Sequence, residues 1–192
     1  MIKVGINGFG RIGRLVLRAI LENYKSKIQV VAINDLGSIE TNAHLIKYDS
    51  THGTINEDIQ TSSDGFKISN QNIKVFGERD PANIPWGKVG ADVVLECTGI
   101  FLDKKSSEKH IKGGAKKVII SAPGKEVDFT IVQGVNSKDL KKEHNIISNG
   151  SCTTNCLAPV AMVLEKNFGI NYGYMTTIHS YTGDQKLLDT LH

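Results

Sequence analysis

Apolar and polar residues follow one another in a regular rhythm along most of the chain. Short, nearly continuous apolar runs are typical of parallel strands covered on both faces, and stretches with helical spacing separate them. The runs predict strands at residues 2–6, 28–33, 92–97, 117–120, 129–132 and 145–147. The spacing predicts helices at residues 15–21, 41–48 and 104–111, with a short one at 137–143. This alternation predicts an α/β fold with a doubly wound, mostly parallel sheet.

Residues 50–83 interrupt the rhythm with shorter strands and turns. Polar turn sequences occur at residues 63–65 and 69–72. We therefore expect residues 55–59 and 68–76 to form a small antiparallel excursion from the main sheet.

A glycine-rich turn joins the first expected strand to the first expected helix. Gly8, Gly10 and Gly13 have the spacing GxGxxG, and Asp35 ends the second strand, at about the 20-residue separation expected for dinucleotide binding. In such folds the three glycines permit the tight turn, the approach of the pyrophosphate and the close packing of the helix. The alternative, an ordinary strand-to-helix turn that happens to contain three glycines, explains less of this context.

Asp35 also bears on the choice of cofactor. A carboxylate at this position accepts hydrogen bonds from the ribose 2′-hydroxyl and repels a 2′-phosphate. No Arg or Lys lies between Leu36 and Glu40 to reverse this preference. The sequence therefore predicts NAD rather than NADP.

Several polar and glycine residues directly follow the expected parallel strands, and ligands of such sheets bind beyond the carboxyl ends of the strands. These residues are Gly8, Asp35, Thr98, Gly99, Ser121, Ser148 and Asn149. The chain leaves its last strand at this edge and enters a cysteine-containing segment. We therefore expect Cys152 to lie near the nicotinamide end of the cofactor.

Residues 148–156 combine two cysteines with small polar residues, ahead of an apolar run at 157–164. This pattern is typical of a helix N-terminus, with Ser151 as the cap. Cys152 would lie in the first turn, where the helix dipole favours the nucleophilic thiolate. The alternative is a buried structural cysteine in a polar loop, and the geometry of the sheet edge favours the nucleophile.

The other two cysteines carry weaker signals. Cys156 is one turn from Cys152 on the same face of the expected helix. No matching Cys/His pair occurs elsewhere in the sequence, so we expect no metal site. We interpret Cys156 as part of the pocket wall or the core, and Cys97 as packed core.

The segment after the cysteines predicts one helix and one strand. Apolar residues at 157–168 predict a buried helix. Pro159 should either kink this helix or shift its effective start. Residues 173–182 are rich in aromatic and β-branched types and predict a strand. It contains His179, which suits a catalytic thiolate as ion-pair partner and proton carrier. Ordinary hydrogen-bonded roles are expected for His44, His52, His110, His144 and His192.

Composition narrows the functional class. The 192 residues include 40% hydrophobic and 22% charged residues, which is ordinary for a globular protein. The net charge of +3 is too small to suggest nucleic-acid binding. We expect no signal peptide, because residues 1–3 run straight into an apolar strand. We expect no membrane association, because no apolar stretch approaches the ~20 residues of a span. Three cysteines cannot all pair, and the sequence around them lacks the loop-rich character of a secreted scaffold, which favours the reducing cytoplasm.

Three motifs resemble the phosphorylating, NAD-dependent, bacterial-type glyceraldehyde-3-phosphate dehydrogenases. They are residues 7–14, NGFGRIGR; residues 151–156, SCTTNC; and residues 179–182, HSYT. The resemblance implies that Cys152 is the nucleophile and that His179 activates its thiol. By position it assigns NAD contacts to Arg11, Ile12, Asp35, Arg79 and Ser121. It assigns substrate or phosphate contacts to Ser151, Thr153 and Thr182.

The resemblance also implies an architecture and a reaction. Residues 1–150 would form a Rossmann-type NAD-binding domain, and residues 151–192 the first helix and strand of an incomplete α+β catalytic domain. The activity would be the oxidation of glyceraldehyde 3-phosphate with inorganic phosphate and NAD, giving 1,3-bisphosphoglycerate, in a homotetramer. Three alternatives stay open: an erythrose-4-phosphate dehydrogenase, an inactive NAD-binding module, and a truncated, poorly folded product.

Overall fold

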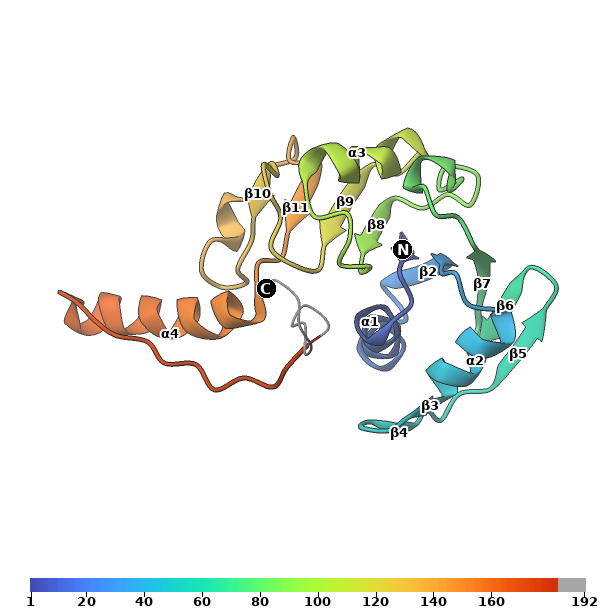
Figure 1. Cartoon of the computed structure of the whole chain (residues 1–192), viewed down its shortest axis with the longest axis horizontal. Coiled ribbons are helices and arrows are strands. Elements are labelled where there is room, and N and C mark those ends of the chain that lie inside the picture. The colour runs from blue at the N-terminus through green and yellow to red at the C-terminus, as the bar shows by residue number, and fades with distance from the viewer. Residues whose placement is uncertain (183–192) are drawn as a thin grey trace, which may run out of the picture.

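A long mixed sheet forms the centre of the protein in the computed structural model, which describes residues 1–182 (Figure 1). Within these residues the sheet has nine strands in the order β10-β11-β9-β8-β1-β2-β7-β6-β5. In chain order the strands are β1 (Ile2–Asn7), β2 (Ile28–Asn34), β5 (Ile59–Ser62), β6 (Gly65–Ile68), β7 (Gln71–Phe76), β8 (Val93–Glu96), β9 (Lys117–Ile120), β10 (Phe129–Thr130) and β11 (Ile146–Ser148). A separate two-stranded hairpin consists of β3 (Tyr48–Asp49) and β4 (Gly53–Thr54).

Helices connect most of the parallel strands and cover the sheet. The α-helices are α1 (Arg11–Asn23), α2 (Ile39–Lys47), α3 (Lys104–Lys112) and α4 (Cys152–Phe168). The short 3₁₀ helices are η1 (Pro81–Asn83) and η2 (Ser137–Asp139). The expected helix at residues 137–143 is therefore only a single turn at η2. Residues 140–144 beyond it contain one apolar residue, Leu140, which is exposed and does not pack onto the sheet.

Seven neighbouring strands, from β10 across to β7, are parallel. The apolar runs predicted this for six of them, and β7 was expected in the antiparallel excursion instead. The antiparallel excursion is present, but its limits differ from those expected. β7 pairs in parallel with β2, and the antiparallel pairs are β5 with β6 and β6 with β7. Periodicity alone did not separate β6 from β7, because residues 65–68 and 71–76 form one apolar segment interrupted only by a turn.

The order of the strands reverses at the centre of the sheet. β1 pairs with β2 on one side and with β8 on the other, and both pairings are parallel. The connections from β1 and β8 therefore leave in opposite directions, which opens a crevice at the carboxyl ends of these strands. This is the expected place for a ligand.

Apolar clusters bury both faces of the sheet. One contains Ile6, Leu17 and Ile33, together with residues of α2 and β6. On the other face, Trp86 packs with neighbours that include Val94. Full burial of one such side chain stabilises a fold by about 1.5–3 kcal/mol, so these clusters hold the strand ends in fixed positions.

Helix α4 departs from the sequence-based expectation of a buried helix. It begins at Cys152, as the cap predicted, and continues through Pro159 without a later start. None of its residues is buried, and the side chains of Val160 and Phe168 are 55% and 83% exposed. Figure 1 shows why: α4 extends away from the sheet, so none of the layers in residues 1–182 covers its apolar side.

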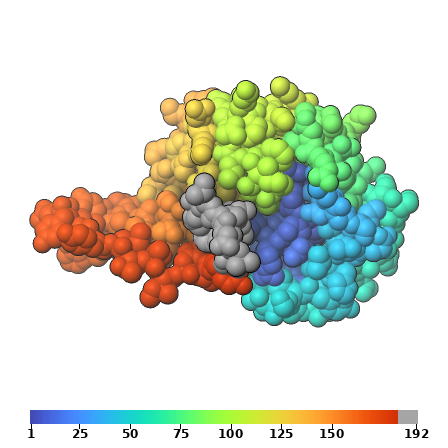
Figure 2. All heavy atoms as spheres, viewed as in Figure 1, coloured from blue at the N-terminus to red at the C-terminus, as the bar shows by residue number. Residues whose placement is uncertain are grey.

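The expected strand at residues 173–182 is also absent from the described structure. These residues have no strand assignment, and Tyr174 and Ile178 are almost fully exposed. A β-rich sequence needs a neighbouring strand to complete its ladder, and this segment pairs with none of the described strands. Figure 2 shows this segment and α4 as a protrusion from the rounded body formed by the sheet and its helices. His192 and the end of the second expected domain lie outside the described residues.

Candidate active site

The turn between β1 and α1 uses its three glycines in three different ways. Gly8 has a φ of 86°, and a Cβ on it would lie 2.8 Å from the backbone nitrogen of Thr98. A Cβ on Gly13 would lie 2.2 Å from the carbonyl oxygen of Gly8, so α1 can approach β1 only at a glycine. A Cβ on Gly10 would meet no atom within 4 Å. Gly10 therefore faces open space, as required where a pyrophosphate approaches the backbone.

The N-terminus of α1 offers uncapped backbone donors at this turn. Gly10 is the N-cap, and no side chain accepts a hydrogen bond from the first turn. Free N–H groups and the positive end of the helix dipole favour an anion such as a phosphate group. Arg11, in the same turn, forms an ion pair with Asp49.

Asp35 is held at the end of β2 by two backbone donors. Its Oδ2 accepts a hydrogen bond from the Phe9 N–H at 2.9 Å, and its Oδ1 accepts one from the Gly37 N–H at 2.9 Å. A carboxylate has about four acceptor positions, so the side chain keeps capacity for further donors. Asp35 is thus fixed between the glycine turn and the start of α2 with acceptor positions available to a ribose.

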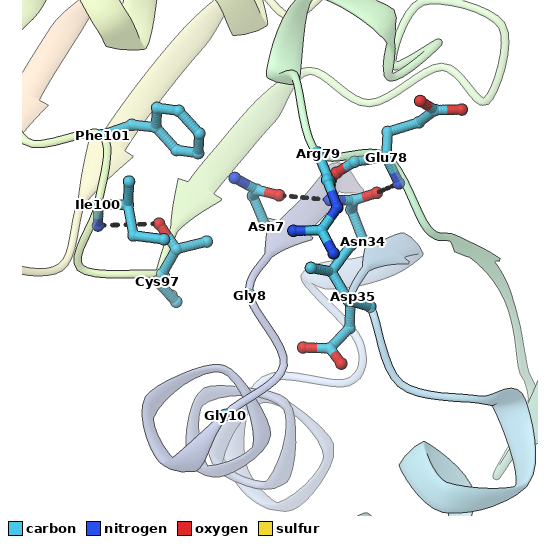
Figure 3. Close-up of a pocket in the computed structure, with 12 residues that line it drawn as sticks. Asn7, Gly8, Gly10, Asn34, Asp35, Glu78, Arg79, Cys97, Ile100 and Phe101 are labelled. Atoms are coloured by element: carbon cyan, nitrogen blue, oxygen red, sulfur yellow. Dashed lines mark hydrogen bonds between the residues drawn. The ribbon is translucent and has the colours of Figure 1, made fainter. Parts of the chain in front are cut away.

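These features meet in a pocket of about 380 Å³ at the reversal of strand order (Figure 3). Its size suits a small-molecule ligand. The lining residues are Asn7, Gly8, Gly10, Asn34, Asp35, Leu36, Glu78, Arg79, Cys97, Thr98, Ile100 and Phe101. The sequence-based candidates among them are Gly8, Gly10, Asp35, Arg79 and Thr98. The lining does not include the candidates Arg11, Ile12, Gly13, Gly99 and Ser121.

Arg79 reaches the pocket because Asn34 holds the loop that carries it. The Asn34 amide donates to the Glu78 carbonyl at 2.9 Å and accepts from the Glu78 N–H at 2.8 Å. Figure 3 shows Asn34 and Arg79 on the same side of the pocket as Asp35. Sequence reasoning missed Asn34, although its position directly before Asp35 at a strand end was an available signal.

Cys97 and Ser121 lie together at the adjacent strand ends. The Ser121 N–H donates to the Glu96 carbonyl at 3.0 Å, which continues the pairing of β8 with β9. Burial raises the pKa of the Cys97 thiol to about 12, although a hydrogen bond with the Ser121 side chain opposes this shift. Cys97 is therefore a packed, unreactive thiol, in line with its sequence-based interpretation, although it also lines the pocket.

Cys152 lies in the first turn of α4, directly after its cap. The Ser151 hydroxyl accepts a hydrogen bond from the Thr154 N–H at 2.9 Å, which is the capping contact expected from the sequence. The Sγ of Cys152 lies 2.9 Å from Nε2 of His179. This contact, assisted by hydrogen bonds from Thr153, lowers the pKa of the Cys152 thiol.

The orientation of the His179 ring is fixed by its other nitrogen. Nδ1 lies 2.6 Å from the Ser180 carbonyl oxygen, which can only accept, so Nδ1 carries a proton. This bond, with the contact to Cys152, raises the pKa of His179. Nε2 therefore faces the sulfur and is the atom that gains or loses a proton. The two shifts favour a thiolate beside an imidazolium.

The remaining candidates lie at exposed or half-buried positions around α4 or in the core of the sheet. Ser151 and Thr153 are half-buried at the start of α4, and Thr182 is exposed at the end of the described chain. Cys156 is exposed rather than part of a core or pocket wall, because the layer that would cover this side of α4 is not among residues 1–182. His110 is a hydrogen-bonded core residue, as expected.

Residues 1–182 contain neither a metal-binding cluster nor a membrane-spanning helix. No group of three or more His, Cys, Asp or Glu side chains is arranged to hold a metal ion in that part of the chain. Neither does any helix within those residues have the length and apolar character needed to cross a membrane.

Comparison with known proteins identifies two matching domain families. Residues 2–104 match the NAD-binding domain of glyceraldehyde 3-phosphate dehydrogenase, and residues 151–192 match the C-terminal domain of the same enzyme. The chain belongs to the glyceraldehyde-3-phosphate dehydrogenase family. This confirms the resemblance seen in the three sequence motifs, the Rossmann-type fold and the NAD-binding character of the N-terminal part.

Relatives in the glyceraldehyde-3-phosphate dehydrogenase family match along the whole chain. Glyceraldehyde-3-phosphate dehydrogenase 2 of Streptomyces avermitilis is 56% identical over 192 residues, which are 100% of this chain and 57% of the relative. The Xanthobacter flavus enzyme is 53% identical over 191 residues, again 57% of its length. The Pseudomonas aeruginosa enzyme is 52% identical over 192 residues, 58% of its length. The chain therefore spans less than two thirds of these relatives.

The pocket of this glyceraldehyde-3-phosphate dehydrogenase family member fits NAD on geometric grounds. The open space beside Gly10 lies at an uncapped helix N-terminus, and the Asp35 carboxylate lines the same pocket. An anionic pyrophosphate suits the first feature, and a ribose with a free 2′-hydroxyl suits the second. The boundary expected at residue 150 stays a prediction.

Proposed function

We propose that a protein containing this chain and the remainder of the catalytic domain found in its relatives oxidises glyceraldehyde 3-phosphate. Inorganic phosphate and NAD are the co-substrates, and 1,3-bisphosphoglycerate is the product. The observation that carries this proposal is the 2.9 Å contact between Cys152 Sγ and His179 Nε2 at a capped helix start. The contact occurs in a chain whose N-terminal part is an NAD-binding domain.

In the proposed first step, the Cys152 thiolate attacks the aldehyde carbon and the carbonyl electron pair moves to oxygen. The His179 imidazolium gives that oxygen its Nε2 proton, which completes a thiohemiacetal. His179 then takes the hydroxyl proton back as the C–H bond breaks. NAD, when bound, supplies the hydride acceptor for this step. Cys152 is left as a thioester that retains the energy of the oxidation.

In the second step, inorganic phosphate attacks the thioester carbon. The C–S bond breaks and returns Cys152 to its thiolate, while the acyl group leaves as an acyl phosphate. We propose that Ser151, Thr153 and Thr182 hold the phosphate groups. Hydroxyls at a helix N-terminus suit anions, which supports Ser151 and Thr153, and Thr182 is proposed on the family motif alone. The lowered pKa of Cys152 supports both steps, because a stable thiolate is a good leaving group as well as a ready nucleophile.

For the cofactor, we propose that Asp35 binds the adenosine ribose and that Gly8, Gly10 and Gly13 shape the pyrophosphate site. Arg79 and Thr98, which line the pocket, are proposed contacts on either side. Arg11 and Ile12 are proposed contacts on the family motif alone. Gly99 is proposed because it directly follows a parallel strand, and Ser121 on both grounds. A homotetramer in the cytoplasm is proposed on the same family grounds, and the free thiols of Cys97, Cys152 and Cys156 are compatible with a reducing compartment.

The decisive test is an assay of this chain and of a version completed with the C-terminal part of the Streptomyces avermitilis relative. The completed protein should form NADH from glyceraldehyde 3-phosphate only when phosphate is present, and Cys152→Ser should abolish the activity. Preference for erythrose 4-phosphate would contradict the proposed substrate. If the 192-residue chain binds NAD but does not turn over, it acts as an NAD-binding module on its own.

A further inference from the structure

Behind the cofactor pocket lies a fully buried carboxylate that is surrounded by hydrogen-bond donors. Glu96, the last residue of β8, has no exposed surface. Its Oε2 accepts from Asn7 Nδ2 at 2.6 Å and lies 2.9 Å from His110 Nε2. Its Oε1 accepts from the Thr98 N–H at 2.7 Å and from the Thr98 hydroxyl. These donors fill the approximate capacity of an ionised carboxylate, so a proton on Glu96 would displace one of them.

The protonation of His110 follows from the residue behind it. The indole N–H of Trp86 donates to His110 Nδ1 at 3.0 Å, and both side chains are fully buried. An indole nitrogen can only donate, so Nδ1 must carry no proton. The ring proton is therefore on Nε2 and is donated to Glu96. His110, oriented by Trp86, is thus a neutral donor to the Glu96 carboxylate on the side away from the pocket.

On the pocket side, Glu96 sets the orientation of two amides in series. Because Asn7 Nδ2 donates to Glu96, Asn7 Oδ1 faces Asn34 and accepts from its Nδ2 at 2.8 Å. Asn34 therefore turns its remaining amide N–H and its Oδ1 towards the backbone of Glu78. Figure 3 shows the contacts of Asn34 with Asn7 and with Glu78 along the pocket wall. A flip of either amide would place donor against donor, so the loop before Arg79 depends on the carboxylate.

Glu96 also shapes the loop on the opposite wall. Thr98 directs both its N–H and its hydroxyl to the carboxylate, and the same hydroxyl accepts from the Ile100 N–H at 3.1 Å. The loop is thereby folded back towards the glycine turn, where the Thr98 nitrogen lies 2.8 Å from the position of a Cβ on Gly8. One buried side chain thus joins the three walls formed by the glycine turn, the Arg79 loop and the Thr98 loop.

We propose that Glu96 is a positioning residue for the cofactor, held by His110 and Trp86, and that it keeps both loops of the pocket in the NAD-binding arrangement. This inference rests on the proposed use of the pocket for NAD. It assigns a function to a residue that would make no contact with the cofactor itself. It also explains a buried charge that the apolar packing of the sheet does not require.

The first test replaces the carboxylate by its nearest neutral equivalent. In Glu96→Gln an amide N–H must face one of the present donors, so the dissociation constant for NAD should rise about tenfold or more. Calorimetric titration of the 192-residue chain with NAD measures this change. The matched control is Val118→Ala, which trims a fully buried residue of the same sheet outside this network. Equal losses of NAD affinity in both variants, at similar melting temperatures, would show a merely structural role.

A second pair of variants tests the inference even if Glu96→Gln does not fold. His110→Gln keeps an N–H within reach of Glu96, and its affinity for NAD should stay within about threefold of the original. His110→Leu removes the donor and should bind NAD about tenfold more weakly or worse. Similar affinities in the two variants would overturn the inference.

The outcomes separate this inference from the proposed function. If the unsubstituted chain binds no NAD, both fail. If it binds NAD and neither Glu96→Gln nor His110→Leu weakens binding, only the positioning role fails. If these variants weaken binding while the completed protein does not oxidise glyceraldehyde 3-phosphate, the positioning role stands and the proposed reaction fails.

Discussion

Cys152 and His179 stabilise each other's charged form. The hydrogen bond between them lowers the pKa of the thiol, and the Ser180 carbonyl together with the sulfur raises the pKa of the imidazole. The thiolate therefore persists to a lower pH than for a free cysteine, and the imidazolium to a higher pH than for a free histidine. Both shifts favour the ion pair, which is lost by protonation of the sulfur as pH falls and by deprotonation of the ring as pH rises.

Selective alkylation tests this pair. At pH 7, iodoacetamide should label Cys152 about tenfold or more faster than Cys156, because the thiolate is the reacting form. Cys97 should react last, since burial raises its pKa to about 12. Mass spectrometry of the labelled peptides measures the three rates. His179→Asn should slow the labelling of Cys152 alone, and equal labelling of all three thiols would contradict an activated site.

A second prediction at the residue scale concerns Asp35 and the preference for NAD over NADP. Asp35→Ser removes the charge that repels a 2′-phosphate and the acceptors for a 2′-hydroxyl. Affinity for NAD should fall about tenfold, and that for NADP should rise or stay constant. Titrations with both cofactors give the ratio, and Asp35→Asn, which keeps the size but removes the charge and one of the two acceptor oxygens, is the comparison variant. An unchanged ratio in Asp35→Ser would refute the assignment.

At the scale of elements, two glycines of the β1–α1 turn have different roles: Gly13 allows close packing, and Gly10 leaves space for the ligand. Gly13→Ala should lower both the melting temperature and NAD affinity, because its Cβ would overlap the Gly8 carbonyl. Gly10→Ala should leave the melting temperature nearly unchanged, since its Cβ meets no atom, but should weaken NAD binding about tenfold. Thermal unfolding and calorimetric titration measure the two quantities. Loss of stability in Gly10→Ala would show that Gly10 has a packing role instead.

The elements were largely predictable because each has its own local signal. The glycine turn, the cap at Ser151 and the apolar runs of β1, β2, β8 and β9 all follow from short-range chemistry. The contacts made by Asn34 and Glu96 did not, because they join residues far apart in the chain. For example, Asn7 and Glu96 are distant in sequence and meet only when β1 and β8 pair. A polar residue inside an apolar strand gave no indication of its partner.

At the scale of the whole molecule, the burial expected for α4 requires a covering layer. The apolar pattern at residues 157–168 correctly predicted a helix with an apolar side, but a pattern records which side needs burial and not what buries it. Leu157, Val160 and Leu164 are 42%, 55% and 45% exposed. Residues 169–175 follow α4 closely enough to form a shared apolar hollow with it but leave it open.

This surface predicts the solution behaviour of the 192-residue chain. An exposed apolar area of this kind favours association, so the chain should bind a hydrophobic dye and self-associate with rising concentration. Val160→Lys with Leu164→Lys should reduce both effects and leave NAD affinity unchanged. Light scattering after gel filtration measures the association, and Lys105→Glu, a charge change on α3, is a control. Dye binding unaffected by the α4 substitutions would show that another surface is responsible.

The buried network has an optical consequence. Trp86 is the single tryptophan of the chain, its ring lies against Gly5, and its N–H is bonded to His110. Emission excited at indole wavelengths therefore comes from one ring, which lies behind the pocket and is linked to it through His110 and Glu96. Trp86 is therefore an intrinsic fluorophore at the place where the two halves of the sheet meet. We expect this emission to be blue-shifted in the folded chain and to move towards that of free tryptophan as β1 and β8 separate.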